Sequence, residues 1–329
     1  MSDLRLEGRV AVVTGGGRGL GRAYAVALAA AGAAVIVNDV DEASATETAE
    51  LIVGAGGRAV AEPGSVGPAP TADRLVARAI AEFGRLDVML TNAGVLRDHV
   101  LWKMTDEDFD AVIDTHLRGT FTCARAAAIR MREQDEGGRL ILVGSPAGQF
   151  GNFGQTNYAA AKAGVTAFAR TWALELARAR ITVNAIIPTA WTAMTASIPR
   201  YASIVRVMAA GGPLPEAMRR DHAIGGPEDC APLVVFLASD AAAQITGQAI
   251  GIGGDKLTLY SHPREIVSAD REGGWSVASI AAAWSESFAG SLQPYGIEHS
   301  PLDLEPAIRD EVRPLVLKEN AARLLGLSD

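Results

Sequence analysis

The sequence predicts an α/β fold, a doubly wound seven-stranded parallel sheet followed by a C-terminal extension. Over the first 250 residues, short apolar runs rich in β-branched residues alternate with segments of helical length. These runs are continuously apolar, as in strands that helices cover on both faces of a parallel sheet. Seven runs with glycine-rich turns favour an open sheet over an eight-stranded barrel. We expect residues 1–254 to form one domain and residues 255–329 to extend it.

The first half of the predicted sheet alternates strictly with helices. Its strands are expected at Val10–Thr14, Ala34–Asp39 and Ala59–Glu62, and the helices that follow them at Leu20–Ala31, Glu42–Val53 and Thr71–Phe83. Such repetition of strand and helix requires crossover connections, which make neighbouring strands parallel.

The second half continues the pattern with longer connections. Four further strands are expected at Val88–Thr91, Leu140–Ser145, Thr182–Ile187 and Ala249–Ile252, and a helix is expected to run through Leu176. Residues 189–226 break the rhythm with prolines and Gly211-Gly212, which is typical either of a substrate lid or of a surface excursion. In the extension, Val277, Ile280, Ala281, Trp284 and Phe288 recur at helical spacing and predict an amphipathic helix for core packing or a subunit contact.

Composition narrows the class of protein. The net charge of −8 and the pI near 5.3 argue against nucleic acid as the partner, the alternative being a local basic groove. The longest apolar run, Ala23–Val37, is too short to span a bilayer. Cys123 and Cys230 are far apart and lack metal-binding spacing, so we expect buried thiols and no metal site. The charged start does not resemble a secretory signal, and a cytoplasmic protein is expected.

A glycine-rich turn follows the first predicted strand and opens a helix. In Thr14-Gly-Gly-Gly-Arg-Gly-Leu-Gly21 the free N–H groups at the helix start favour a pyrophosphate. Gly15 permits the tight turn, while Gly19 and Gly21 let phosphate and backbone approach closely. The spacing is TGxxxGxG and not GxGxxG, and a purely structural turn is the alternative.

Asp39 ends the second predicted strand, where a carboxylate can accept hydrogen bonds from an adenosine ribose. A 2′-phosphate beside that charge would cost about 1–4 kcal/mol, which favours NAD. Arg18 could partly offset this cost for NADP, and Asp39 could also cap the following helix.

Three polar residues predict the catalytic chemistry. Tyr158 and Lys162 stand one helical turn apart on the same face. A phenol with a pKa of about 10 becomes a base at neutral pH only if its pKa falls by about three units, which an ammonium at about 4 Å can supply. Ser145 ends the fifth predicted strand, at the sheet edge where such folds bind ligands. A solvated helix face is the alternative for a tyrosine–lysine pair alone.

The chain resembles the short-chain dehydrogenase/reductase superfamily in three motifs: TGGGRGLG, TNAG at 91–94, and Ser145 with Tyr158 and Lys162. The motifs occur in the same order as in that family, and the resemblance covers residues 7 to about 254. Further segments resemble the (3R)-hydroxyacyl-CoA dehydrogenase part of D-bifunctional proteins, also called 17β-hydroxysteroid dehydrogenase type 4. These segments are Arg22-Ala-Tyr24, Val37-Asn-Asp39, Asn92-Ala-Gly-Val-Leu-Arg-Asp98, His116-Leu-Arg-Gly119 and Phe150-Gly-Asn-Phe-Gly-Gln155.

The resemblance implies a role for each matched residue. Tyr158 exchanges the alcohol proton, Ser145 orients the substrate oxygen, and Lys162 lowers the tyrosine pKa and holds the nicotinamide ribose. The cofactor-binding residues would be Gly15, Arg18, Gly19, Leu20, Gly21, Asp39, Val66, Asn92, Ala93, Gly94, Tyr158, Lys162, Pro188 and Thr189.

The chain departs from the family pattern at three places. His116 replaces the asparagine that links the lysine to a water relay, and either a relay or a packing role is open. Gly64-Ser65-Val66 lacks the usual acidic residue near the adenine. Pro188-Thr189 replaces the usual Pro-Gly.

The expected function is NAD-dependent oxidation of a (3R)-3-hydroxyacyl-CoA with a fatty or steroid-like chain. The CoA phosphates could meet Arg97, Lys103, Arg200, Arg206, Arg219 or Arg220, or these cations could be ordinary solvated surface. A dehydrogenase for hydroxysteroids or other lipophilic alcohols without CoA is the alternative. A catalytically silent NAD-binding scaffold is a second alternative, and a homodimer or homotetramer is expected from the resemblance.

Overall fold

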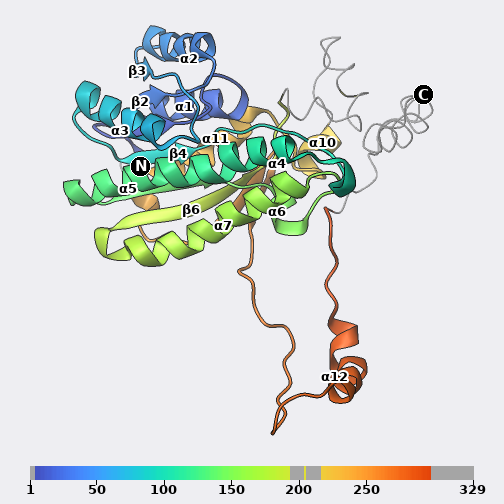
Figure 1. Ribbon diagram of the computed structural model, residues 1–329. Helices are drawn as coiled ribbons and strands as arrows, with labels where there is room; N and C mark the ends of the chain where they lie inside the picture. The colour runs from blue at the N-terminus through green and yellow to red at the C-terminus, as the bar shows by residue number, and fades with distance from the viewer. Residues whose placement is uncertain (1–3, 193–203, 205–215, 298–329) are drawn as a thin grey trace.

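The computed structural model of the chain describes residues 4–192, 204 and 216–297. Its strands form one sheet in the order β3-β2-β1-β4-β5-β6-β7-β8 (Figure 1). The strands are β1 (Val10–Val13), β2 (Ala34–Val37), β3 (Arg58–Ala61), β4 (Val88–Thr91), β5 (Gly138–Val143), β6 (Ile181–Pro188), β7 (Ala249–Gly253) and β8 (Lys256–Leu259). The first seven pair in parallel, which confirms the predicted doubly wound, or Rossmann, sheet.

Strand β8 was not expected. It returns antiparallel to β7 after a tight turn in which Gly254 has a φ of +50°, a conformation that glycine adopts without strain. Leu257 and Leu259 are both 68% exposed, so this edge strand contributes little to the core. The strand has only four residues, which alternate between polar and apolar, so the sequence carried no signal of a buried strand here.

Helices cover both faces of the sheet. The long ones are α1 (Gly19–Ala30), α2 (Glu42–Gly54), α3 (Ala69–Phe83), α5 (Gly119–Gln134), α7 (Thr156–Leu176) and α11 (Pro227–Ala238). One buried cluster joins β1 and β2 to α1, α2 and α11, and the other joins the opposite strand faces to α3, α5 and α7. Shorter helices are η2 (Leu101–Lys103), α4 (Asp106–Val112), η3 (Ile113–Arg118), α6 (Pro146–Phe150), η4 (Ala177–Ala179), α10 (Glu216–Arg220) and η6 (Asp240–Ala242).

The strand order reverses between β1 and β4, which lie side by side although three helices and two strands separate them in the chain. Connections leave these two strands toward opposite halves of the sheet, so their carboxyl ends open a crevice. The glycine-rich turn follows β1, and TNAG begins in the last residue of β4. The topology therefore places both motifs at the crevice where this fold binds ligands.

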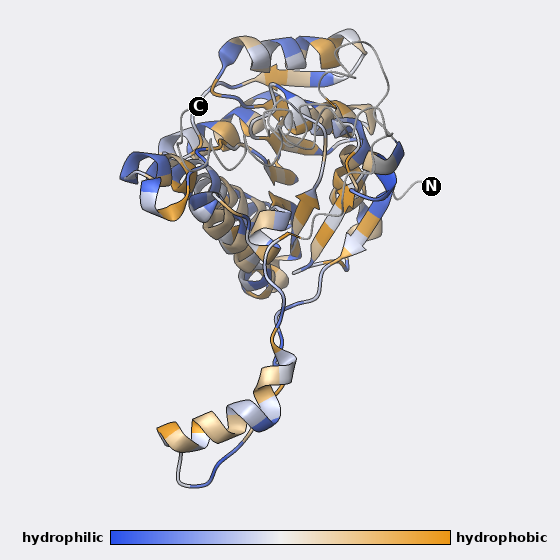
Figure 2. Ribbon diagram, turned by 90° about the vertical axis from the view of Figure 1, so that its right-hand side faces the viewer, coloured by the Kyte–Doolittle hydropathy of each residue, from blue (hydrophilic) through white to orange (hydrophobic). Residues whose placement is uncertain are grey.

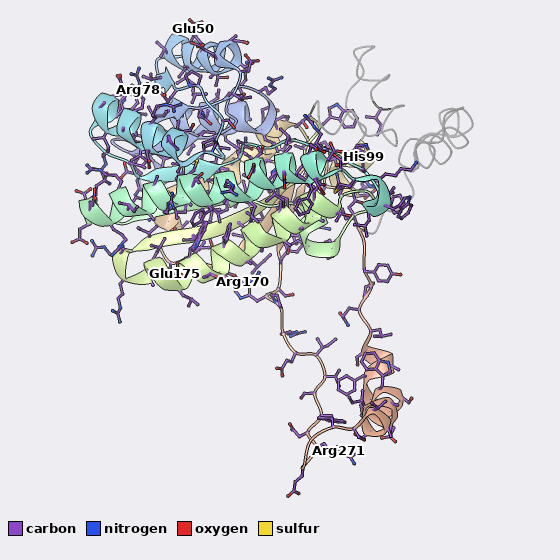
Figure 3. The ribbon with its side chains drawn as sticks, viewed as in Figure 1. Glu50, Arg78, His99, Arg170, Glu175 and Arg271 are labelled. Atoms are coloured by element: carbon purple, nitrogen blue, oxygen red, sulfur yellow. The ribbon has the colours of Figure 1, made fainter. Side chains whose placement is uncertain are left out.

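The extension leaves the sheet after Leu259 and projects from the body as an arm (Figures 1 and 2). It carries α12 (Val277–Ala283), η7 (Trp284–Phe288) and η8 (Ala289–Ser291), which confirms the predicted helix. Val277 is 87% exposed and Trp284 49%, so these apolar side chains do not pack into the core of this chain. Arg271 lies near the far end of the arm (Figure 3). The division into domains at residue 254 stays a prediction.

Both cysteines are buried free thiols, as expected. In the described part of the chain, no helix combines the length and the apolar character needed to cross a membrane.

Candidate active site

The glycine-rich turn is built so that only glycine fits at its key positions. Gly15 has a φ of +62° and Gly19 a φ of +53°. A Cβ at Gly21 would collide with the backbone oxygen of Gly15, so the first turn of α1 lies directly against the loop. An added Cβ at Gly19 would lie 3.7 Å from Thr192 Cγ2, which shows that the segment after β6 passes close to this turn.

Thr14 and Asn92 tie the two sides of the crevice together. The Asn92 side-chain amide donates to the backbone oxygens of Thr14 (3.0 Å) and Gly15 (3.1 Å). In return, Thr14 Oγ1 accepts from the backbone N–H groups of Asn92 (3.0 Å) and Ala93 (3.1 Å). Asn92 therefore acts by holding the glycine turn in place. The bridging role of Thr14 was missed, because a threonine ending a strand carries no distinctive signal.

Asp39 lies at the glycine turn with only 7% of its surface exposed. Its Oδ2 accepts from the Gly17 N–H at 3.0 Å, and its Oδ1 accepts from the Asp41 N–H at 3.1 Å. The cap of α2 is Asp41 and not Asp39, since Asp41 accepts from the Ser44 N–H. Arg18 pairs with Asp41 at 3.1 Å, so its charge is already partly balanced.

The other predicted cofactor residues surround the same edge of the sheet. Val66 is 4% exposed, and its carbonyl accepts from Thr122 Oγ1 at 2.8 Å. Pro188 ends β6, and the Thr189 N–H continues the ladder to the Ile252 oxygen at 2.9 Å. Leu20 packs against the core below the turn. Most of residues 189–226, interpreted above as a lid or a surface excursion, lies outside the described residues.

Ser145 and Tyr158 meet at the carboxyl end of β5. Ser145 follows the strand, and its Oγ accepts from the Ala147 N–H at 3.2 Å as the cap of α6. Tyr158 lies in the first turn of α7 and forms a side-chain hydrogen bond with Ser145. Tyr158 is partly exposed. A substrate oxygen at this point would meet both hydroxyls.

Lys162 is 3% exposed and lies one turn after Tyr158. Its Nζ donates to the Val143 carbonyl at 2.5 Å and lies 5.7 Å from the centre of the Tyr158 ring. Burial lowers the pKa of Lys162 to about 7, because the low-dielectric surroundings disfavour the ammonium.

The expected depression of the Tyr158 pKa is not found in the protein alone. Burial raises the pKa of Tyr158 above its usual value, the hydrogen bond from Ser145 lowers it, and the charge of Asp98 raises it further. The expectation counted only the attraction of an ammonium and left out the loss of hydration that burial imposes on a phenolate. Activation of Tyr158 therefore needs more positive charge than Lys162 supplies in this state.

His116 lies beside Tyr158 in η3, a π-helical turn, and is 2% exposed. The two rings meet edge to face with centroids 5.1 Å apart. Nε2 lies 2.8 Å from the Val95 oxygen and 3.0 Å from the Val95 nitrogen, and Nδ1 has no hydrogen-bond partner among the described residues. Burial, and then the charge of Lys162, lower the pKa of His116 to about 3, so the ring is neutral.

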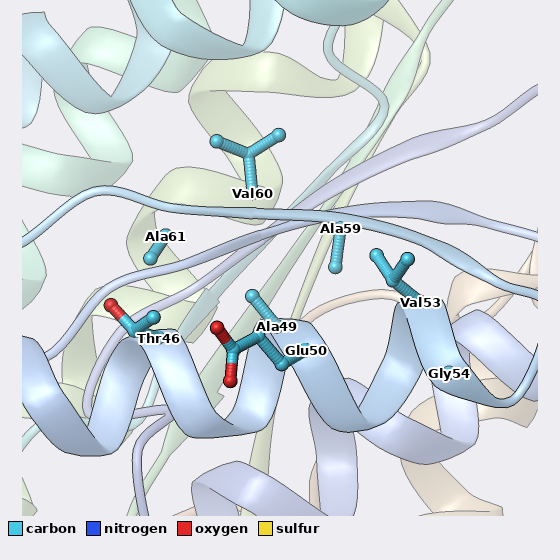
Figure 4. Close-up of a pocket in the computed structure, with 8 residues that line it drawn as sticks. All are labelled: Thr46, Ala49, Glu50, Val53, Gly54, Ala59, Val60 and Ala61. Carbon is cyan, nitrogen blue, oxygen red and sulfur yellow. The ribbon is translucent and has the colours of Figure 1, made fainter.

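No described cluster of histidine, cysteine or acidic residues has the geometry of a metal site. The hollow in Figure 4 lies between α2 and β3 and contains neither Ser145 nor Tyr158. Its lining residues are Thr46, Ala49, Glu50, Val53, Gly54, Ala59, Val60 and Ala61. This wall carries two polar side chains, Thr46 and Glu50, and none of the predicted site residues, so the candidate site remains at the crevice.

The geometry fits a nicotinamide dinucleotide. Glycines open the start of α1 to a pyrophosphate, a buried carboxylate stands where a ribose would lie, and a serine, a tyrosine and a lysine meet at the same sheet edge. These features define the class of dinucleotide-dependent oxidoreductases with a doubly wound sheet.

Comparison with known proteins identifies the family within this class. The short chain dehydrogenase model matches residues 9–201, and the chain belongs to this family. It is 41% identical over 301 residues to the hydroxyacyl-CoA dehydrogenase ChsB1 of Mycobacterium tuberculosis, with 87% of this chain and 90% of that protein covered. The predicted resemblance is confirmed.

A second relative is longer than this chain. The match to the peroxisomal multifunctional enzyme type 2 of Drosophila melanogaster is 44% identical over 204 residues and covers 59% of this chain but 33% of that protein. Among solved structures, a short chain dehydrogenase from Mycobacterium avium superposes with a TM-score of 0.76 at 32% identity, covering 90% of this chain and 99% of that one. The chain is therefore an oxidoreductase that uses NAD or NADP and acts on hydroxyl groups.

Proposed function

We propose that this chain is an NAD-dependent dehydrogenase that interconverts a (3R)-3-hydroxyacyl-CoA and its 3-ketone. The observation that carries the proposal is the meeting of Ser145, Tyr158 and Lys162 at the crevice that the glycine turn and Asp39 also border. The 41% identity to a hydroxyacyl-CoA dehydrogenase from Mycobacterium tuberculosis supports the substrate class.

In the proposed mechanism, the Ser145 hydroxyl and the Tyr158 hydroxyl both hydrogen-bond the substrate oxygen. During oxidation Tyr158 accepts the alcohol proton, and during reduction it returns that proton to the carbonyl oxygen. A bound nicotinamide would exchange the hydride with the substrate carbon and add a positive charge beside the phenol. Lys162, anchored on the Val143 oxygen, lies close enough to stabilise the phenolate and to hold a ribose hydroxyl.

The preference for NAD rests on two carboxylates. Asp39 is held at the glycine turn by Gly17 and Asp41, so it cannot turn away from a 2′-phosphate without losing both hydrogen bonds. Arg18, the cation expected to offset this charge, pairs with Asp41. Both observations support binding of a cofactor without the 2′-phosphate.

His116 is proposed as a relay member in the tautomer whose Nε2 carries the proton and donates to the Val95 oxygen at 2.8 Å, which leaves Nδ1 to accept a hydrogen bond. A ring with a pKa of about 3 does not hold a second proton near neutral pH, so it would act as an acceptor and not as an acid. His116→Asn restores the residue usual in this family and is expected to keep turnover within a few-fold, whereas His116→Phe should lower kcat more strongly.

Apolar side chains near the catalytic group support a lipophilic substrate. Phe150 and Phe153 lie between Ser145 and Tyr158 in the sequence and are 46% and 64% exposed. Trp102 is 70% exposed. The bridge between His99 and Gln155 brings their two segments together. Exposed aromatic side chains are costly in water and favour contact with an acyl chain.

The CoA part of the proposal has less support, which keeps the alternative open. Arg219 pairs with Asp229 (2.7 Å) and Asp255 (3.0 Å), and Arg220 pairs with Asp221 and Glu216. These cations are therefore already neutralised. Arg97 and Lys103 remain as candidates beside the site, and Arg200 and Arg206 lie outside the described residues. A dehydrogenase for lipophilic or steroid alcohols without CoA is the second candidate.

A substrate panel separates the two. Reduction of NAD is followed with (3R)- and (3S)-3-hydroxyacyl-CoA of increasing chain length, with the free hydroxy acids and with hydroxysteroids. The proposal expects the (3R)-thioesters to give the highest kcat/KM, rising with chain length. Equal rates for free alcohols would support the second candidate, and activity with the (3S)-thioesters alone would contradict the stereochemical assignment.

The arm is proposed as a contact between copies of this chain in a homodimer or homotetramer. Its apolar side chains are exposed, and both ends of the arm meet Phe150, through the Tyr260 ring (6.0 Å) and the Gly296 N–H (2.7 Å). Sedimentation should show a smaller assembly when residues 261–329 are removed. The two free thiols also suit the reducing cytoplasm that we propose as the location.

A further inference from the structure

Asp98 and Gln155 form a partly buried link beside the catalytic helix. Gln155 directly precedes α7 and is 8% exposed. Its Nε2 donates to Asp98 Oδ2 at 2.8 Å, and its Oε1 accepts from Asn152 Nδ2 at 2.9 Å. Because both ends of the amide are engaged, the N–H side of Gln155 must face the carboxylate.

A second residue joins the same two segments. Asn157, which is fully buried, donates through Nδ2 to the carbonyls of Arg97 and Asp108, each at 3.0 Å. His99, labelled in Figure 3, pairs with Asp108 at 3.2 Å, and its backbone bridges to Gln155. Residues 97–99 are therefore fastened to the residues that immediately precede Tyr158.

The charges around Tyr158 come from three elements. Lys162 lies one turn along α7, and His116 contacts the ring from η3 and is neutral. Asp98, on the segment after β4, is tied through Gln155 to the start of α7, and its charge raises the pKa of Tyr158. Ser145 contributes a hydrogen bond and no charge. Asp98 is thus the negative group among the described residues that acts on the phenol, and its field opposes that of the ammonium.

We propose that Asp98 is a positioning residue for the reaction: its carboxylate, held by Gln155, anchors the start of α7 and places a negative charge beside the helical turn that carries Tyr158. The inference rests on the proposed role of Tyr158 as the group that exchanges the proton. In ketone reduction the O–H of Tyr158 gives its proton to the substrate oxygen and becomes a phenolate, and in oxidation the phenolate takes that proton back. Asp98 favours the protonated state, which is the state that donates in reduction.

The test is Asp98→Asn, which removes the charge and keeps an oxygen to accept from Gln155. In the oxidative direction, we expect the midpoint of the acid limb of the kcat profile to fall by about one pH unit, as for loss of a unit charge within roughly 8 Å. Asp98→Glu should keep the midpoint of the natural protein. Asp110→Asn, which removes an exposed charge from α4, is the matched control and should leave it unchanged.

Gln155→Leu separates anchoring from charge. It keeps the carboxylate but removes its donor, so kcat should fall at every pH without a shift of the midpoint to lower pH. A purely structural role of Asp98 would give this same pattern in Asp98→Asn, and that result would overturn the proposal.

A readout independent of turnover distinguishes failure of this inference from failure of the proposed function. The carbon-13 Cζ resonance of Tyr158, identified by its loss in Tyr158→Phe, is followed with pH in NAD-saturated protein. In Asp98→Asn it should titrate at lower pH than in the natural protein, whichever substrate the enzyme uses. An unchanged or higher titration midpoint would overturn the electrostatic role of Asp98 even if the substrate assignment holds.

Discussion

Replacing Asp39 by asparagine tests the proposed choice of cofactor. The substitution removes the carboxylate charge and keeps an oxygen that can accept from the Gly17 N–H, now 3.0 Å from Asp39 Oδ2. The glycine turn should therefore retain its shape, so that a change in affinity reports on charge.

The magnitude follows from electrostatics. Unit charges about 8 Å apart interact by about 2 kcal/mol at an effective dielectric constant of about 20. This corresponds to roughly 30-fold in affinity. Asp39 is only 7% exposed, so screening by solvent is limited. We expect Asp39→Asn to raise the affinity for NADP relative to NAD by about one to two powers of ten.

The assay measures Kd for NAD and for NADP by calorimetry at two salt concentrations. Glu133→Gln is the matched control, since it removes an exposed charge near the end of α5, at the opposite edge of the sheet. Its ratio of the two Kd values should equal that of the natural protein. The reasoning fails if Asp39→Asn leaves the ratio unchanged, or if the natural protein binds NADP more tightly than NAD.

Three further predictions follow from the site. Tyr158→Phe should lower kcat by about 10²- to 10⁴-fold with little change in Kd for NAD. The control Tyr260→Phe should leave kcat within a few-fold. Full turnover by Tyr158→Phe would refute the catalytic assignment and favour the alternative of a catalytically silent NAD-binding scaffold. Burial lowers the pKa of Lys162 from 10.5 to about 7. Between these two pH values the folded protein binds fewer protons at Lys162 than the unfolded chain does. The contribution of Lys162 to the free energy of unfolding therefore rises with pH over this range. Urea unfolding of Lys162→Met should show a slope against pH smaller by up to about 1.4 kcal/mol per unit, and equal slopes would contradict this. Gly21→Ala should weaken NAD binding more than tenfold, because the added Cβ would collide with the Gly15 oxygen. Gly54→Ala is the control, since the space around Gly54 is open. Similar Kd values for the two variants would argue against close packing of the helix start on the glycine turn.

Local pattern determined the elements and the motifs. Most of the seven parallel strands were predicted because they are buried, β-branched runs, while β3 followed from the alternation of strand and helix. The turn after β1 was predicted because glycines there can adopt positive φ. Ser145, Tyr158 and Lys162 were found because a strand end and a helical spacing fix where their backbones lie. Strand β8 was missed because an exposed edge strand has no such pattern.

The sequence by itself determined the sheet and which residues reach its carboxyl edge, because these depend on periodicity and on chain direction. Only the tertiary structure decided how those residues are tuned. Asp41 and not Asp39 caps α2, Arg18 is paired, and Tyr158 is a weaker acid than its lysine neighbour alone implied. Asp98 lies 60 residues before Tyr158 in the chain and is linked to the start of α7 by its hydrogen bond with Gln155. Hydration and charge depend on such distant neighbours, which no local pattern contains.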